Sequence, residues 1–83
     1  MKMIILIPAY NEEDTISRTI QNIPSSFEGI DEISILVVDD GSTDATRPTA
    51  EKEGAVVVSH TRNRGVGSAF HTAVQYALEN RAD

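Results

Sequence analysis

Apolar residues in this chain gather into three short runs with little polar interruption. The runs are Met3–Pro8, Ile33–Asp39 and Ala55–His60. Continuous apolar runs of this length, rich in Ile and Val, are typical of β-strands that are buried on both faces. The pattern therefore predicts three strands of a parallel sheet.

The segments between and after these runs repeat their apolar residues every three or four positions, which predicts helices. In the first segment Ile16, Ile20 and Ile23 follow this spacing. Asn11 is the expected N-cap, because its short polar side chain can accept a hydrogen bond from a free backbone amide. Pro24 is expected to end this helix.

A second helix is predicted between Ser42 or Thr43 as its N-cap and Gly54 just after its end. Pro48 requires this helix to begin late or to kink, because proline lacks the backbone N–H that a helix interior needs. A third helix is predicted from Gly65 onward. Its expected apolar face consists of Val66, Ala69, Phe70, Ala73, Val74, Ala77 and Leu78.

Strands that alternate with helices predict one α/β domain, a Rossmann-like three-layer sandwich with a parallel sheet in the order β-α-β-α-β-α. Ligands of such sheets bind outside the C-terminal ends of the strands. The three segments at these ends are Pro8–Glu13, Asp39–Asp44 and Ser59–Gly65. We therefore expect them to meet at one edge and to form a site.

Composition excludes several functions. The 83 residues leave room for a single domain, and 13 acidic against 7 basic residues give a net charge of −6, which argues against nucleic-acid binding. The apolar runs are far shorter than the ~20 residues of a membrane helix. The absence of cysteine excludes a disulfide framework and a thiolate zinc site. We expect a protein of the cytoplasm or of the cytoplasmic face of a membrane.

Two adjacent carboxylates, Asp39 and Asp40, end the second predicted strand. Successive side chains of a strand point to opposite faces, so the two acids are expected to differ in role. Asp39 is expected to hold the turn formed by Gly41 and Ser42, and Asp40 to project into the cleft as an acceptor for N–H groups of a ligand. The alternative is that both acids only cap the turn and face solvent.

Tyr10 stands at the mouth of the first strand, where its ring could stack on a base or sugar. Glu12 or Glu13 could accept a ligand hydroxyl or N–H. The alternative is that Pro8 only ends the strand and that the acids only precede a helix.

Arg62, Arg64, Gly65 and Gly67 surround the start of the third helix. Helix N-terminal amides and two guanidinium groups suit a pyrophosphate. The alternative is that the glycines only allow the chain to pass close to the sheet.

The histidines carry weaker signals. His71 shares a polar helix stripe with Gln75 and Glu79, which predicts a surface residue, whereas His60 ends the third strand near the expected cleft. No Ser-His-Asp set or metal-ligand cluster can be assembled from the sequence, so no catalytic residue and no metal ligand is assigned.

Three motifs follow one another in this chain: IPAYNEE at Ile7–Glu13, VVDDGSTDAT at Val37–Thr46 and NRGVGSA at Asn63–Ala69. Together they resemble the N-terminal, donor-nucleotide half of family-2 nucleotide-sugar glycosyltransferases, in particular dolichyl-phosphate mannose synthases and related polyprenyl-phosphate glycosyltransferases. Their shared order and spacing are much more specific than any one motif, and the resemblance covers nearly the whole chain.

The resemblance implies roles for individual residues. The segment matching Pro8, Ala9 and Tyr10 lines the nucleoside pocket, as does the residue matching Glu12. Asp40 matches the acid that contacts the base. Further donor-site candidates beside the pocket are Arg62, Arg64, Gly65 and Gly67.

The resemblance also implies the N-terminal part of a glycosyltransferase A-type fold. The full-length protein would transfer a sugar from a UDP- or GDP-sugar, with inversion, to an acceptor such as a membrane-associated polyprenyl phosphate. In that family a D-x-D motif on the next strand binds Mg²⁺ or Mn²⁺. This chain ends at Asp83, about where that strand would begin. We therefore expect residues 1–83 to be a partial domain that lacks the D-x-D strand and the acceptor half, holds no metal and is inactive alone.

In the resembled fold the missing strand pairs with the first strand, whose apolar edge would then be exposed here and would favour a homo-oligomer. An alternative function is a non-catalytic module from a truncated gene that binds a nucleotide or only self-associates. A phosphoacceptor receiver domain is a third interpretation, because those domains can carry ILVVDD on their first strand. Here the pair ends the second strand.

Overall fold

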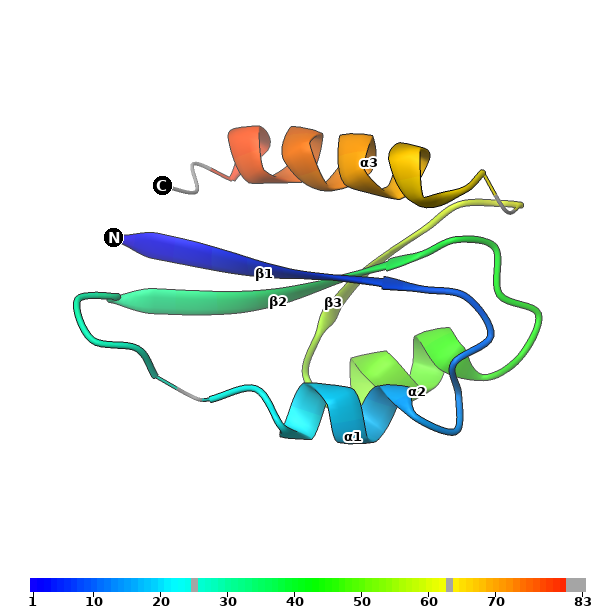
Figure 1. Cartoon of the computed structure of the whole chain (residues 1–83), viewed down its shortest axis with the longest axis horizontal. Coiled ribbons are helices and arrows are strands. Elements are labelled where there is room, and N and C mark those ends of the chain that lie inside the picture. The colour runs from blue at the N-terminus through cyan, green and yellow to red at the C-terminus, as the bar shows by residue number, and fades with distance from the viewer. Residues whose placement is uncertain (25, 63, 81–83) are drawn as a thin grey trace.

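A computed structural model describes residues 1–24, 26–62 and 64–80 of the chain. Three parallel strands alternate with three helices, and the helices cover both faces of the sheet: α1 and α2 lie on one side and α3 on the other (Figure 1). The predicted Rossmann-like α/β fold is confirmed. The elements are β1 (Lys2–Ala9), α1 (Ile16–Gln21), β2 (Glu32–Asp39), α2 (Thr46–Lys52), β3 (Val56–Ser59) and α3 (Val66–Glu79).

The sheet order is β1-β2-β3, so β2 is central and β1 is an edge strand. The C-terminal ends of the strands are level, because Asp39 pairs with Ala9 on one side and with Ser59 on the other. Two backbone hydrogen bonds continue this pairing: Asp40 N–H donates to the Ala9 carbonyl at 2.8 Å, and His60 N–H donates to the Asp39 carbonyl at 2.8 Å. Residues that follow the strands are thereby held side by side.

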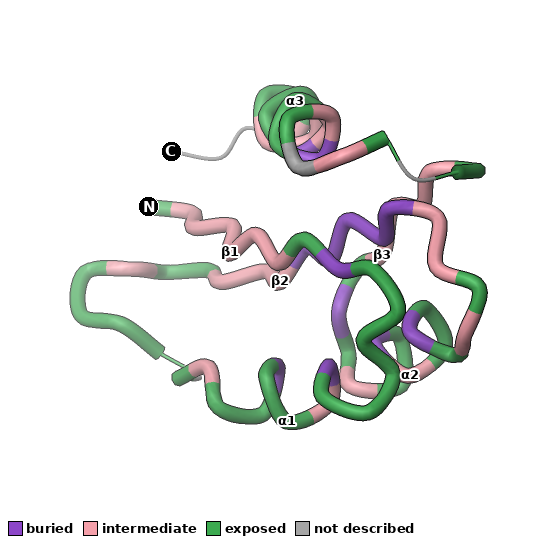
Figure 2. The backbone as a smooth tube through the Cα atoms, turned by 45° about the vertical axis from the view of Figure 1, so that its right-hand side comes forward, coloured by how far each residue is buried: buried purple, intermediate pink, exposed green. Residues whose placement is uncertain are grey.

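Alternate residues of β2 build two separate apolar cores. Val37 packs on the side of α1 and α2 with Ile16, Ile20 and Ala50, among others. Leu36 and Val38 pack on the other side, against α3. Buried residues concentrate in the second half of β2, whereas much of each helix is exposed (Figure 2). The central strand therefore joins the two layers of helices.

Helix α1 begins later than its sequence predicts. Asn11 does not cap it, because its backbone has a left-handed φ of 51° and its side-chain oxygen accepts a hydrogen bond from Thr43 N–H at 2.9 Å. The helix starts at Ile16 and ends at Gln21. The acidic residues that follow Asn11 therefore precede the helix and do not form its first turn.

Helix α2 begins at Thr46, which places Pro48 in the first turn, where a missing N–H costs no intrahelical hydrogen bond. The late start was one of the two expected solutions and is confirmed, but the N-cap is Ala45 and not Ser42 or Thr43. Gly54 has a φ of 89° just after the C-cap residue Glu53, as expected for a glycine that ends a helix.

The apolar face of α3 is only partly covered. Ala69 and Ala73 are buried against the sheet, but Phe70, Val74 and Leu78 are 63%, 42% and 75% exposed. The prediction of one buried stripe is wrong for these three residues, because the three-stranded sheet is too narrow to cover the whole stripe. No described helix has the length and apolar character needed to span a bilayer.

Candidate functional site

A pocket of about 260 Å³ opens where β1 and β2 end, beside the start of α3. The aromatic ring of Tyr10, which is 46% exposed, and the carboxylate-bearing residues Glu12 and Asp40 contribute to its wall. All of the lining residues except Ala69 belong to the set predicted from sequence. They are Pro8, Ala9, Tyr10, Glu12, Asp40, Gly65 and Ala69.

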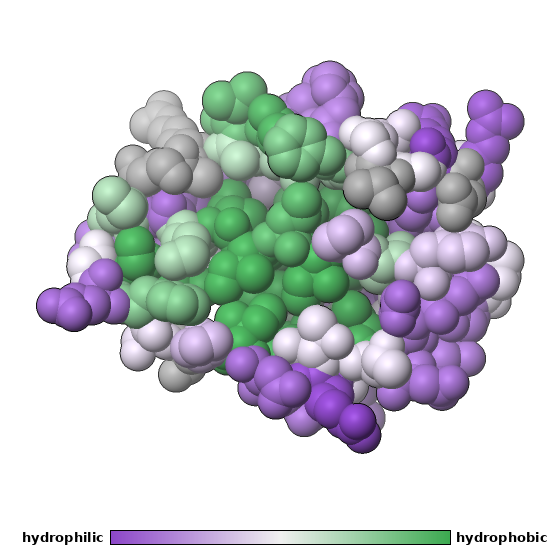
Figure 3. Space-filling model, in the orientation of Figure 1, coloured by the Kyte–Doolittle hydropathy of each residue, from purple (hydrophilic) through white to green (hydrophobic). Residues whose placement is uncertain are grey.

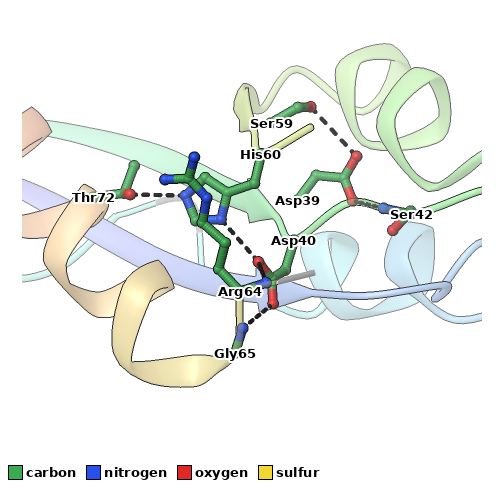
Figure 4. A network of polar contacts seen from close by, with 8 residues as sticks. All are labelled: Asp39, Asp40, Ser42, Ser59, His60, Arg64, Gly65 and Thr72. Atoms are coloured by element: carbon green, nitrogen blue, oxygen red, sulfur yellow. Dashed lines mark hydrogen bonds and ion pairs between the residues drawn. The ribbon is translucent and has the colours of Figure 1, made fainter. Parts of the chain in front are cut away.

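Asp40 lines this pocket, but most of its carboxylate is engaged by the protein. Oδ1 accepts hydrogen bonds from His60 Nδ1 at 2.8 Å and from Arg64 N–H at 2.9 Å, and Oδ2 accepts one from Gly65 N–H at 2.8 Å (Figure 4). The residue is only 6% exposed. A carboxylate has about four acceptor positions. Among the described contacts, Oδ2 is therefore the oxygen with capacity for a ligand N–H.

Asp39 points to the opposite face of the sheet, as the alternation of a strand requires. Its Oδ1 accepts a hydrogen bond from Ser42 N–H at 3.0 Å and its Oδ2 accepts one from the Ser59 hydroxyl at 3.3 Å. Gly41 makes the turn between them with a φ of 81°, a backbone conformation that other residues rarely adopt. The two neighbouring acids thus stabilise different segments. Asp39 stabilises the turn after β2, and Asp40 stabilises the start of α3.

Hydrogen bonds join the loop after β1 to the loop after β2, and we call residues 11–13 and 42–46 together the loop brace. Asn11 makes two of these contacts: its N–H donates to Ser42 Oγ at 2.8 Å, and its Oδ1 accepts from Thr43 N–H at 2.9 Å. Glu12 N–H donates to Thr46 Oγ1 at 2.8 Å. The two loops that follow β1 and β2 therefore form one structural unit beside the pocket.

Asp44 completes the loop brace. Its Oδ2 accepts a hydrogen bond from Glu13 N–H at 3.3 Å, and its Oδ1 accepts from Thr46 N–H at 2.9 Å and also from the Thr46 hydroxyl. Sequence reasoning missed both Asp44 and Thr46, because nothing in the TDAT segment alone distinguishes residues that bond across loops from residues that cap a local helix.

The chain is expected to lose stability as the pH falls below about 4. Hydrogen bonds from His60 and from the Arg64 and Gly65 amides hold the pKa of Asp40 below its ordinary value of 3.8. Burial raises the pKa of Asp44, but hydrogen bonds from the Thr46 hydroxyl and amide outweigh this and lower it overall. Because both carboxylates bind protons more weakly when folded, their stabilisation is present above 3.8 and is lost as the pH falls through the folded-state pKa.

Thermal unfolding followed by circular dichroism between pH 2 and pH 6 tests this expectation. Asp44→Asn should flatten the acid side of the profile, whereas Asp14→Asn, a change at an exposed acid, should leave its shape unchanged. An identical acid profile for wild type and Asp44→Asn would contradict the assignment.

The remaining predicted residues lie beside the pocket. Arg62 and Arg64 are exposed and do not line it, and Arg64 contributes through its backbone amide. Gly65 has a φ of 91° at the N-cap of α3. A Cβ atom on Gly65 or Gly67 would meet no atom within 4 Å, so close packing against the sheet is not the reason for either glycine. Asn63, in the third motif, lies outside the described residues.

His60 is the site residue that the sequence signalled most weakly. It contacts Asp40 directly, while His71 is exposed on α3 as predicted. Within the described residues, no group of three or more His, Asp or Glu side chains could hold a metal ion.

A parallel α/β sheet with a pocket at the C-terminal strand ends is the arrangement of Rossmann-like nucleotide-binding proteins. Residues 4–80 match the family described as Glycosyl transferase family 2. The chain belongs to this family, which confirms the resemblance and excludes the receiver-domain interpretation.

Relatives and solved structures agree with this assignment. The dolichol-phosphate mannosyltransferase of Pyrococcus furiosus is 33% identical over 83% of this chain and 20% of its own length. The mannosyltransferase of Pyrobaculum calidifontis, solved with GDP-Man and Mn²⁺, has a TM-score of 0.77 and 30% identity over 92% of this chain and 24% of its own. Glucosyl-3-phosphoglycerate synthase of Mycobacterium tuberculosis, solved with Mn²⁺ and UDP-glucose, has a TM-score of 0.56 and 43% identity over 71% of this chain and 21% of its own.

The chain spans only a fraction of the curated relatives that it matches. It covers 20% of the Pyrococcus furiosus enzyme and 37% of the UDP-N-acetylglucosamine--dolichyl-phosphate N-acetylglucosaminyltransferase of Methanococcus voltae.

Proposed function

We propose that this chain is the donor-nucleotide part of a nucleotide-sugar glycosyltransferase and that the pocket at its strand ends binds the nucleoside. The observation that carries this proposal is the pocket lining: Tyr10 and Glu12 from the loop after β1 and Asp40 from the end of β2 line one pocket. The exposed ring of Tyr10 offers a stacking surface, and Asp40 Oδ2 offers an acceptor for a base N–H. The neighbours solved with GDP-Man and UDP-glucose support a nucleotide-sugar donor.

The proposal extends to the whole enzyme. Residues 1–83 are a partial donor domain; the D-x-D strand, the acceptor half and the catalytic residues belong to further sequence. The acceptor is a polyprenyl phosphate, as the name of the dolichol-phosphate mannosyltransferase relative suggests. Transfer takes place with inversion at the cytoplasmic face of a membrane. Mg²⁺ or Mn²⁺ bound outside the described residues would neutralise the leaving diphosphate. Accordingly the 83-residue chain does not transfer sugar, and turnover by the purified chain would contradict this.

Titration calorimetry with UDP and GDP, with and without Mn²⁺, tests nucleotide binding by the chain. Tyr10→Ala is expected to weaken binding by about 1–3 kcal/mol, because stacking of a base on an aromatic ring contributes that amount. Phe27→Ala is the matched control, since Phe27 is also a partly exposed aromatic residue and lies in the loop before β2, away from the strand ends.

Binding that is weakened by Tyr10→Ala and unchanged by Phe27→Ala would support the pocket as the nucleoside site. Equal effects of the two substitutions would place the ligand elsewhere. Absence of binding by wild type to both nucleotides would show that residues 1–83 do not form a donor site by themselves.

We also propose that the chain self-associates through the free edge of β1. This strand pairs only with β2 among the described residues, and Pro8, which has no N–H to donate, is accommodated on such an edge. Apolar side chains cover the middle of the face on which β1 lies (Figure 3). An apolar strand edge favours pairing with a second copy of itself. Self-association without catalysis is also one of the two forms of the alternative function, a non-catalytic module that binds a nucleotide or only self-associates.

Light scattering at tens of micromolar is expected to report a dimer. Ile5→Lys should return the chain to a monomer, because a charge on β1 would be buried at the new interface. Val56→Lys introduces the same charge on the other edge strand, β3, and should leave the dimer intact. A monodisperse wild-type monomer would contradict self-association.

A further inference from the structure

His60 connects the pocket acid to the last helix. Its Nδ1 lies 2.8 Å from Asp40 Oδ1 and its Nε2 lies 2.8 Å from Thr72 Oγ1 on α3 (Figure 4). The imidazole is 7% exposed, so both contacts are largely shielded from water. Both ring nitrogens are thus engaged, one by an acid of the pocket wall and one by a hydroxyl of the helix.

We propose that His60 is a positioning residue of the donor pocket, which holds the Asp40 carboxylate and the start of α3 in the arrangement that leaves Asp40 Oδ2 facing the ligand. The ligand part of this inference rests on the proposed function. The geometric part concerns only contacts within the described chain.

The chemistry of the contacts indicates which ring nitrogen donates to Asp40. The pKa of Asp40 is lowered, first of all by the His60 hydrogen bond, so the carboxylate is ionised and only accepts. Nδ1 therefore carries the hydrogen that is donated to Asp40. In the neutral ring Nε2 then accepts a hydrogen bond from the Thr72 hydroxyl, which fixes the ring orientation.

The carboxylate is held from two directions. The Arg64 and Gly65 amides belong to the segment that leads into α3, and they bond to different oxygens of Asp40. His60 follows β3, whose end is fixed to β2 by the hydrogen bond from His60 N–H to the Asp39 carbonyl. Without the imidazole, the only described donors to Asp40 would lie on the α3 side. The acid and the helix start could then shift together, away from the pocket.

Two substitutions of His60 separate its two contacts. His60→Asn keeps an N–H near the position of Nδ1 and loses the contact to Thr72, whereas His60→Gln places its amide near the position of Nε2 and loses the contact to Asp40. Amide hydrogen exchange at Arg64 and Gly65 is read first, because it needs no nucleotide. UDP and GDP titrations of the same variants follow.

We expect His60→Gln to accelerate exchange at both amides about tenfold or more and to weaken nucleotide binding by a similar factor, as loss of a hydrogen bond to a charged group implies. His60→Asn should stay within about threefold of wild type in both readouts. Unchanged exchange in His60→Gln, or equal losses in the two variants, would overturn the proposal, since equal losses indicate that the ring only fills space.

Two further outcomes are decisive. If wild type binds neither nucleotide, the proposed function fails for this chain, while the exchange data still decide the role of His60. If His60→Gln does not fold, Thr72→Val and Thr72→Ser supply the comparison, because only the serine keeps the hydroxyl bonded to Nε2. Exchange at Arg64 and Gly65 that is faster in Thr72→Val than in Thr72→Ser, by up to about threefold as for His60→Asn, supports the proposal, and equal exchange overturns it.

Discussion

Replacement of Leu36 by alanine is expected to remove a large part of the free energy of unfolding of the chain. Leu36 is completely buried in the central strand and packs in the core beneath α3. A buried Leu→Ala change costs about 2–5 kcal/mol. Stable domains have only about 0.05–0.15 kcal/mol per residue in total, so a chain of this size can lose most of its stability through this one change.

Urea unfolding followed by circular dichroism measures this loss. Leu78→Ala is the matched control, because the same atoms are removed from a residue that is 75% exposed. The control should change the free energy of unfolding by no more than about 0.5 kcal/mol. Similar losses for the two variants would show that the core beneath α3 is not packed as described.

Thr46→Val is expected to lower the free energy of unfolding by about 1–3 kcal/mol, although valine has nearly the same shape as threonine. The Thr46 side chain is completely buried, and its hydroxyl accepts from Glu12 N–H at 2.8 Å and donates to Asp44. Removing the hydroxyl leaves both groups of the loop brace without this partner. Glu12 lines the pocket, so the variant should also bind nucleotide more weakly.

Thr49→Val provides the comparison for this prediction. Thr49 lies in the same helix, α2, and its hydroxyl makes no hydrogen bond among the described contacts. Denaturant unfolding of both variants should show a loss only for Thr46→Val. If Thr49→Val is equally destabilising, the loss of stability in Thr46→Val results from the lower helix propensity of valine and not from damage to the loop brace.

The positions of the strands along the chain could be predicted because each strand is an apolar run that ends in polar residues. The helix boundaries could be predicted less accurately from the sequence. Asn11 has the side chain of an N-cap, but it bonds across the molecule to Thr43, and no local rule contains that partner. The exposure of Phe70 and Leu78 also could not be predicted from the sequence, because periodicity identifies an apolar face without showing how much of it a narrow sheet can cover.

The pocket lining was predicted more completely than its chemistry. Tyr10, Glu12 and Asp40 follow strands that end at one level, so topology alone brings them together. The engagement of Asp40 by His60 was not predictable, because the two residues are 20 positions apart and neither belongs to a recognisable pair in sequence. Sequence indicates which residues reach the strand ends, whereas the partner of each polar atom requires coordinates.

The loop brace also has a consequence for the order of folding. Its cross-loop hydrogen bonds join residues 31 to 34 positions apart. Bringing such distant residues together costs chain entropy before any contact compensates for it. These bonds are therefore expected to form with or after the pairing of β1 and β2, which aligns the two loops. A nascent or partly unfolded chain would accordingly contain helical turns before it contains a pocket, and ligand affinity would report completion of the sheet.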